Sequence, residues 1–111
     1  MRQALVLYNK TLAGRLTEED NGEYLFVYDP DYIQKFPNQF ITFQMPVSPT
    51  PYRSKILFPF FGGLIPEGWL LNIAAESWKI NKNDRMGLLL ACCQNAVGAV
   101  SIQPVNPESH A

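Results

Sequence analysis

The sequence predicts an α+β fold, in which a small antiparallel sheet is accompanied by two or three helices. Short runs of β-prone residues, separated by turn residues, fill the first half of the chain. In the second half, apolar residues recur at the spacing of an α-helix. A last β-prone run follows these helical segments, so the chain is expected to return to the sheet at its end.

The first strands are predicted from local sequence. Leu5–Tyr8 and Thr11–Leu16 are β-prone, and the polar pair Asn9-Lys10 between them is typical of a hairpin turn. Asn21-Gly22 predicts another turn, after which Tyr24–Tyr28 forms an aromatic-rich strand. Side chains alternate across a strand, so the three aromatic residues of this run share one face of the sheet.

Prolines mark the next boundaries. Pro30 ends the third strand and can open a short helical turn over Asp31–Lys35. The run Phe40–Met45 is a further strand candidate, closed by Pro46. Three prolines between Pro46 and Pro51, both included, predict an irregular loop.

Two helices are predicted in the second half. Pro66-Glu67-Gly68 has the composition of a helix start, with a proline at the first position and an acid near the positive end of the dipole. The apolar residues that follow at helical spacing are Leu70, Ile73, Ala74 and Trp78. Asn83 or Asp84 can cap a second helix. Its expected apolar stripe consists of Met86, Leu89, Leu90 and Cys93.

The closing strand is predicted over Gly98–Gln103, immediately before Pro104. We therefore expect one domain over residues 1–104 and a polar C-terminal tail over residues 105–111. One domain also fits the length of 111 residues, which is near the commonest domain size. Hydrophobic residues make up 47% and charged residues 17% of the chain, which indicates a globular fold.

Charge and hydropathy disfavour several classes of partner. Nine basic and ten acidic residues leave a net charge of −1, and no basic stripe is visible, which argues against direct nucleic-acid binding. No apolar run reaches the ~20 residues that a membrane-spanning helix needs. Met1–Tyr8 lacks the features of a secretion signal. We therefore expect a cytoplasmic protein without membrane contacts.

The sequence lacks the residue patterns of catalysis and metal binding. Cys92 and Cys93 are adjacent and cannot form an unstrained disulfide, so two reduced thiols are expected. The single histidine, His110, lies in the predicted tail, which disfavours a metal site and most Ser-His or Cys-His schemes. A three-glycine phosphate loop, His-Arg-Asp and Asp-Phe-Gly do not occur. The sequence thus predicts neither an enzyme nor a cofactor.

Several of these segments, taken in order, resemble the N-terminal subdomain of HipA kinases. The most specific match is Phe60-Phe61-Gly62-Gly63-Leu64-Ile65-Pro66-Glu67-Gly68, followed by Ala96-Val97-Gly98-Ala99-Val100 with Pro104. The first hairpin, Phe26-Val27-Tyr28 and Leu88-Leu89-Leu90 complete the resemblance, which spans about residues 4–104. The family often has Asp-Asn where Gly62-Gly63 stand, and it favours a Gly-Arg-Asp turn at Cys93-Gln94-Asn95.

In HipA kinases this subdomain precedes a kinase core, which the present sequence does not contain. The chain therefore resembles HipS, the small separate subunit of three-component HipBST toxin–antitoxin systems. The resemblance implies a type II antitoxin that binds and inhibits a HipA-like serine/threonine kinase toxin, HipT, that lacks this subdomain. It also implies a ternary complex with a HipB-like DNA-binding protein. The alternative is a structural or activating subunit that completes a split HipA-like kinase without inhibiting it.

An apolar cluster between Phe58 and Trp78 supplies the candidate partner-binding residues. Phe60, Leu64 and Trp78 are interpreted as core residues. Trp69 lies off the apolar stripe of its predicted helix, so it is either half-covered surface or an interface anchor. The candidate partner-binding residues are Trp69, Phe61, Ile65 and Glu67. The charge of Glu67 can instead serve the N-terminus of the predicted helix.

Overall fold

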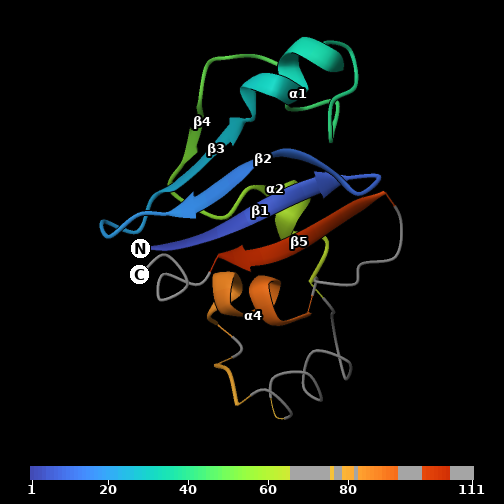
Figure 1. Cartoon of the computed structure of the whole chain (residues 1–111). Coiled ribbons are helices and arrows are strands. Elements are labelled where there is room, and N and C mark those ends of the chain that lie inside the picture. Colours follow the sequence, from blue (N-terminus) through green and yellow to red (C-terminus); the bar gives the residue numbers. More distant parts are fainter. Residues whose placement is uncertain (66–75, 77–78, 82, 93–98, 106–111) are drawn as a thin grey trace, which may run out of the picture.

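The computed structural model describes residues 1–65, 76, 79–81, 83–92 and 99–105. Its centre is a five-stranded antiparallel sheet in the order β4-β3-β2-β1-β5 (Figure 1). The strands are β1 (Arg2–Tyr8), β2 (Thr11–Glu18), β3 (Tyr24–Tyr28), β4 (Tyr52–Ser54) and β5 (Val100–Val105). The helices among the described residues are α1 (Pro30–Lys35), α2 (Pro59–Gly62) and α4 (Arg85–Cys92). This arrangement confirms the predicted α+β class.

The first three strands form where the sequence predicts them. Asn9 and Lys10 have positive φ angles of 49° and 69°, which build the two-residue turn between β1 and β2. The register of this pair shifts between Val6 and Leu7, where a β-bulge is accommodated. β3 spans the predicted range, and its aromatic face points into the core, where Phe26 and Tyr28 are buried.

β5 closes the sheet on the other side of β1 from β2. It begins at Val100 and continues past its predicted end, through Pro104 to Val105, which pairs with Gln3. An edge strand can contain a proline because one row of its backbone groups does not join the ladder. Val105 therefore belongs to the sheet and not to the predicted tail, whose residues 106–111 lie outside the described residues.

Phe26 lies at the centre of the core and is fully buried. Its ring meets Tyr28 edge-on at 4.9 Å between centroids, and Phe61 at 5.7 Å. The same ring lies over the backbone of Gly14. A Cβ added at Gly14 would come within 2.8 Å of the Phe26 ring and 2.4 Å of the Val27 carbonyl oxygen. Because a side chain does not fit there, β2 and β3 can pack in this way only with glycine at that position.

The strand predicted over residues 40–45 does not form. Ile41 and Met45 are 6% and 5% exposed, whereas Phe43 between them is 74% exposed. In a strand all three side chains would share one face, because alternate residues do. The exposure of Phe43 between two buried residues is therefore the pattern of a turn and not of a strand. The Tyr28 hydroxyl holds this segment, because it donates to the Met45 carbonyl and accepts the Ile41 N–H at 3.2 Å. Burial raises the pKa of Tyr28 to about 12.

Short elements flank this segment on both sides. α1 begins as predicted: the Asp29 carboxylate accepts the Asp31 N–H at 3.1 Å, and Pro30 occupies the first turn. β4 and α2 have no counterpart in the sequence-based prediction. They contain three and four residues, which is too short for a periodicity to be recognised.

α4 begins at the predicted cap. The Asp84 carboxylate accepts the Gly87 N–H at 3.1 Å, as an N-cap does. Met86 and Leu89 are fully buried, as predicted, while Leu90 is partly buried against the core. The predicted helix over residues 66–78 lies outside the described residues except for its Glu76, and so does Cys93 of the predicted α4 stripe.

We predict that Gly14→Ala lowers the free energy of unfolding by about 1–3 kcal/mol, because the added Cβ overlaps backbone that cannot move away. Urea denaturation followed by circular dichroism measures this change. Gly63→Ala is the matched control, since a Cβ there meets nothing closer than 3.5 Å and φ is −69°. Equal losses for the two substitutions would contradict the close approach at Gly14.

We predict that Tyr28→Phe, which keeps the ring, destabilises the domain by about 1–3 kcal/mol, the typical cost of buried groups that lose their hydrogen bonds. Amide hydrogen exchange at Ile41 is expected to accelerate, because its N–H loses the Tyr28 hydroxyl. Tyr52→Phe is the control, because the Tyr52 hydroxyl donates to the Pro46 carbonyl at an exposed position. Unchanged exchange at Ile41 would show that the Tyr28 hydroxyl does not hold the segment.

Candidate partner-binding site

α2 carries two of the predicted partner-binding residues into the core. Pro59 occupies its first turn, and Phe58 precedes it. Phe61 is fully buried, with its ring centroid 6.2 Å from that of Phe58 and 5.7 Å from that of Phe26. Ile65, four residues further on, is only 3% exposed. This burial corrects the expectation that Phe61 and Ile65 lie at a partner surface, because both side chains hold α2 and the following turn against the sheet.

Phe60 and Leu64, which the sequence analysis interprets as core residues, are only partly buried and pack against the edge of the core. Residues one helical turn apart share a side, so Phe61 pairs with Ile65 and Phe60 with Leu64. The structure thus buries Phe61 and Ile65, which were expected at the partner surface. It leaves the expected core pair, Phe60 and Leu64, partly exposed. The physical reason is the helical phase of α2, which a four-residue element does not reveal in its sequence.

Glu67 and Trp69, the other two candidates, lie outside the described residues, as does Trp78. Their roles therefore stay predictions. The described structure defines the base on which the candidate site stands, namely α2 and residues 63–65, which lead directly to Glu67 and Trp69 in the sequence.

Arg85 ties α4 to this base. Its guanidinium donates to the Gly62 carbonyl at 3.4 Å, at the end of α2 where a cation is favoured by the free carbonyl groups. A Cβ at Gly62 would come no closer than 3.8 Å to Arg85, and one at Gly63 would meet only backbone at 3.5 Å. Both positions thus accept a side-chain Cβ, which the Asp-Asn pair of the HipA kinases that this sequence resembles would require.

Arg2 joins the sheet to α4 through two carboxylates. Its Nε and Nη2 donate to Glu18 at 2.7 and 2.9 Å, and its Nη1 and Nη2 donate to Asp84 at 3.0 and 2.8 Å. Glu18 is the cross-strand partner of Arg2, whereas Asp84 is 82 residues away in the sequence. Such bidentate pairs combine strength with a fixed geometry. Hydrogen bonding to Arg2 holds the pKa of Asp84 below its ordinary value, and the two carboxylates raise the pKa of Arg2.

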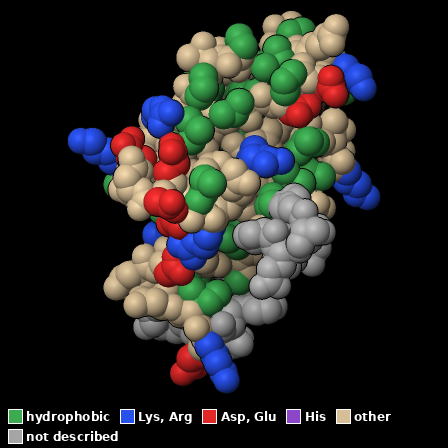
Figure 2. Space-filling view, turned by 60° about the vertical axis from the view of Figure 1, so that its left-hand side comes forward, with side chains coloured by type: hydrophobic (Ala, Val, Ile, Leu, Met, Phe, Trp, Pro, Cys, Tyr) green, Lys and Arg blue, Asp and Glu red, His purple; other side chains and the backbone are tan. Residues whose placement is uncertain are grey.

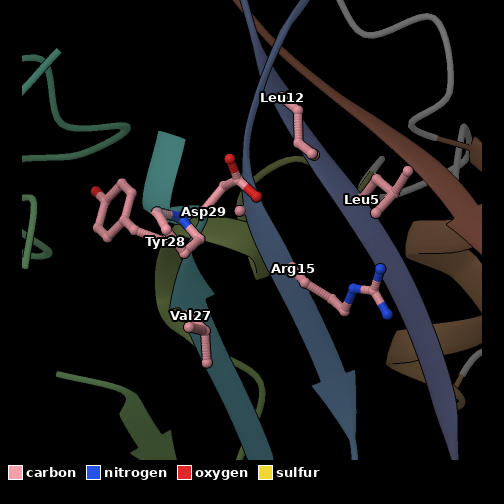
Figure 3. Close-up of a pocket in the computed structure, with 8 residues that line it drawn as sticks. Leu5, Leu12, Arg15, Val27, Tyr28 and Asp29 are labelled. Atoms are coloured by element: carbon pink, nitrogen blue, oxygen red, sulfur yellow. The ribbon is translucent and has the colours of Figure 1, made fainter. Parts of the chain in front are cut away.

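A hollow of about 220 Å³ lies on the face of the sheet that points away from the core, and the sequence analysis did not predict it. Leu5, Arg15 and Val27 lie side by side in it, on β1, β2 and β3 (Figure 3). We call it the outer-face hollow; Leu12 and Asp29 complete its rim. The sequence signal was present, because Val27 puts an apolar side chain on the face opposite the aromatic residues of β3, where antiparallel sheets usually carry polar ones.

Asp84 and Arg85, at the start of α4, are engaged in the structural contacts given above. Within the described part of the chain, no group of three or more His, Cys, Asp or Glu side chains is placed to hold a metal ion. Among the same residues, no helix is long and apolar enough to cross a membrane.

Comparison with known proteins assigns this arrangement to a family. The family model described as the HipA N-terminal domain matches residues 4–103. This chain belongs to that family. The solved structure of an N-terminal domain of HipA toxin superposes with a TM-score of 0.71 at 29% sequence identity, over 96% of this chain and 95% of the other.

Two relatives match most of this chain but differ from each other in length. An uncharacterized protein of Haemophilus influenzae is 39% identical over 88 residues, which are 79% of either chain. The putative kinase Y4mE of Sinorhizobium fredii is 22% identical over 103 residues, which are 93% of this chain. The match spans only 24% of Y4mE, so most of that protein has no counterpart here.

We predict that the HipA N-terminal domain loses stability in acid partly through Asp84. The lowered pKa of Asp84 means that its contribution is complete above about pH 4, the ordinary carboxyl value, and is lost as the pH falls through the lower folded value. Asp84→Asn keeps a cap for α4 but removes this charge. The variant is expected to be about 1 kcal/mol less stable at pH 7, with a shallower decline in acid.

Urea denaturation at several pH values between 2 and 7 measures the free energy of unfolding of the wild-type domain and of Asp84→Asn as a function of pH. Glu23→Gln is the control, because the Glu23 carboxylate accepts a hydrogen bond from the Asn21 amide in a surface turn and, within the described part of the chain, does not bind Arg2. Parallel curves for the wild-type domain and Asp84→Asn would contradict a stabilising pair between Arg2 and Asp84.

Proposed function

We propose that this HipA N-terminal domain is the antitoxin subunit of a type II toxin–antitoxin system. It binds and inhibits in trans a HipA-like serine/threonine kinase toxin of the HipT kind, which lacks this domain. A HipB-like DNA-binding protein completes the ternary complex, and the complex forms in the cytoplasm.

The observation that carries the proposal is the match of 96% of this chain to the N-terminal domain of a HipA toxin. In Y4mE, a putative kinase, the part that matches this chain is 24% of the protein. The Haemophilus influenzae relative matches over 79% of both lengths, so a chain of similar size has a matching sequence as well. A domain that occurs both within a kinase chain and in a chain of its own size is expected to keep its interface with the kinase.

A protein that acts by binding does not need the motifs of phosphoryl transfer. The HipA N-terminal domain is a non-catalytic subdomain. Phosphoryl transfer needs a phosphate cradle, a strand lysine, a catalytic-loop Asp and a metal-binding Asp, and the sequence carries none of their motifs. We infer that the chain affects a kinase by occupying its surface and not by chemistry of its own.

Inhibition does not require entry into an active site. Kinases close their lobes and loops around ATP, and a small domain docked on one lobe can prevent that closure. The base formed by α2 and residues 63–65 suits such docking, because the buried Phe61 and Ile65 hold it against the sheet and Arg85 ties α4 to it. The proposed anchor is Trp69, which follows this base in the sequence and belongs to the commonest class of interface anchor. Glu67 is proposed to contact the partner beside it.

A structural or activating subunit of a split HipA-like kinase is the second candidate. Y4mE favours it, because there the matching part and a putative kinase share one chain. The two candidates agree on the partner and differ in the sign of the effect on phosphorylation. A kinase assay with and without this chain therefore separates them.

We predict that the full chain co-purifies with a HipA-like kinase that lacks this domain, through an interface that buries more than ~1,000 Å². Adding the chain is expected to suppress phosphorylation by that kinase. Size-exclusion chromatography and a radiolabelled-phosphate assay measure the two effects. Separate elution at micromolar concentration would contradict both candidates, while a stable complex with undiminished phosphorylation would favour the second.

Trp69→Ala tests the anchor within the same assays. A hot-spot tryptophan contributes at least ~2 kcal/mol, so affinity should fall about 30-fold while circular dichroism stays unchanged. Phe43→Ala is the matched control, because it removes an aromatic side chain that is 74% exposed and has no role in the proposal. Variants of Phe61 or Ile65 would report on folding, since both are buried. A folded Trp69→Ala that still inhibits fully would overturn the anchor assignment.

A further inference from the structure

The outer-face hollow lies on the side of the sheet that faces away from the core. Leu5 stands between Ala4 and Val6, which are both fully buried, so alternation directs Leu5 to the opposite face. Leu5 pairs with Arg15, and Arg15 pairs with Val27, so the three side chains form a row across β1, β2 and β3. Figure 3 shows Leu5 and Leu12 on one side of the hollow and Val27 on the other, with Arg15 between them.

Apolar side chains that line the hollow remain partly exposed. Leu12 is 38% exposed, and Leu5 and Val27 are each partly buried. Hydrophobic side chains also gather at the end of the molecule where α1 lies, as Figure 2 shows. The side chain of Phe43 is 74% exposed. The hollow differs from such exposed single side chains because it is concave and has a cation at its centre.

Arg15 is the arginine that lacks an acidic or backbone partner in the described structure. Arg2 holds two carboxylates, Arg53 pairs with Glu19 at 3.0 Å, and Arg85 donates to a backbone carbonyl. The Arg15 guanidinium donates only to the side-chain oxygen of Gln3, at 3.3 Å, among the described residues.

The carboxylate on the rim of the hollow serves another purpose. Asp29 accepts the Asp31 N–H and caps α1. In Figure 3 the guanidinium of Arg15 points away from Asp29. The hollow therefore offers a charged donor set, beside apolar walls, that is free to receive a carboxylate from another molecule.

The size of the hollow indicates what kind of molecule fits. Sites for small-molecule ligands and cofactors usually enclose about 300–1,000 Å³. A volume of about 220 Å³ is smaller and suits one or two side chains of a protein. An apolar side chain would cover Leu5, Leu12 and Val27, and an adjacent carboxylate would pair with Arg15.

We propose that the outer-face hollow docks a segment of the partner kinase in which an Asp or Glu stands next to a large apolar residue. This inference rests on the proposed function, because its occupant belongs to the same partner. It adds a second contact surface, on the face of the sheet opposite the core, to the base formed by α2 and residues 63–65. Charge complementarity at this surface speeds association and selects the partner.

The test uses the full chain and the kinase partner that lacks this domain. Arg15→Glu should raise the dissociation constant, measured by calorimetry, at least about tenfold, and Arg15→Gln should raise it less. Lys55→Glu is the matched control, because Lys55 is exposed, does not line the hollow and undergoes the same change of charge. It should alter the dissociation constant less than about twofold. Circular dichroism confirms the folding of each variant. If Arg15→Glu does not fold, Arg15→Gln decides the test. An affinity of Arg15→Gln equal to that of Lys55→Glu would then overturn the inference.

Charge reversal on the partner completes the test. One Asp→Lys or Glu→Lys substitution on the kinase should restore binding to Arg15→Glu and weaken binding to the wild-type chain. If Arg15→Glu binds as Lys55→Glu does, or no reversal restores binding, the inference is overturned and the proposed function stands. If the wild-type chain itself does not bind the kinase, the proposed function fails and this inference falls with it.

Discussion

The ring of Phe26 lying on the bare backbone of Gly14 is the contact on which the rest of the domain depends. Because Gly14 has no Cβ, the ring can approach β2 closely, and its other surfaces remain free for Tyr28 and Phe61. Phe61 brings α2 onto the sheet. Tyr28 reaches beyond β3, where its hydroxyl holds the buried segment around Ile41. One close approach between two strands thus positions a helix and a long irregular segment.

Apolar packing holds α4 against the core but does not by itself set its orientation, because hydrophobic contacts are not directional. The Arg2 guanidinium supplies the missing direction, since it is planar and binds carboxylates on both β2 and the cap of α4. Arg85 of α4 in turn donates a hydrogen bond to the Gly62 carbonyl, which fixes the end of α2 relative to α4. The base of the candidate partner-binding site is therefore held by two arginines of different kinds, one paired with acids and one bound to a backbone carbonyl.

The two faces of the sheet consequently have different tasks. One face is consumed by the core that supports α2 and α4, so its large residues stabilise the domain and are not available to a partner. The opposite face carries a row of apolar residues interrupted by Arg15, which is unusual for a solvated sheet face. For a domain that is proposed to act by binding a partner, such a surface is of more functional interest than the buried aromatic residues of α2.

The sequence by itself determined the features that depend on near neighbours: the Asn9-Lys10 turn, β3, the start of α1 and the cap of α4. These are decided by residues within a few positions of each other, as turn and cap chemistry requires. Only the tertiary structure decided that residues 40–45 wrap around a tyrosine hydroxyl, and that Phe61 points inward while Phe60 does not. The same holds for the partner-binding candidates, because exposure depends on which distant residues cover a side chain. A hydrogen bond spanning 82 residues, or a hollow shared by three strands, leaves no local pattern from which it can be read.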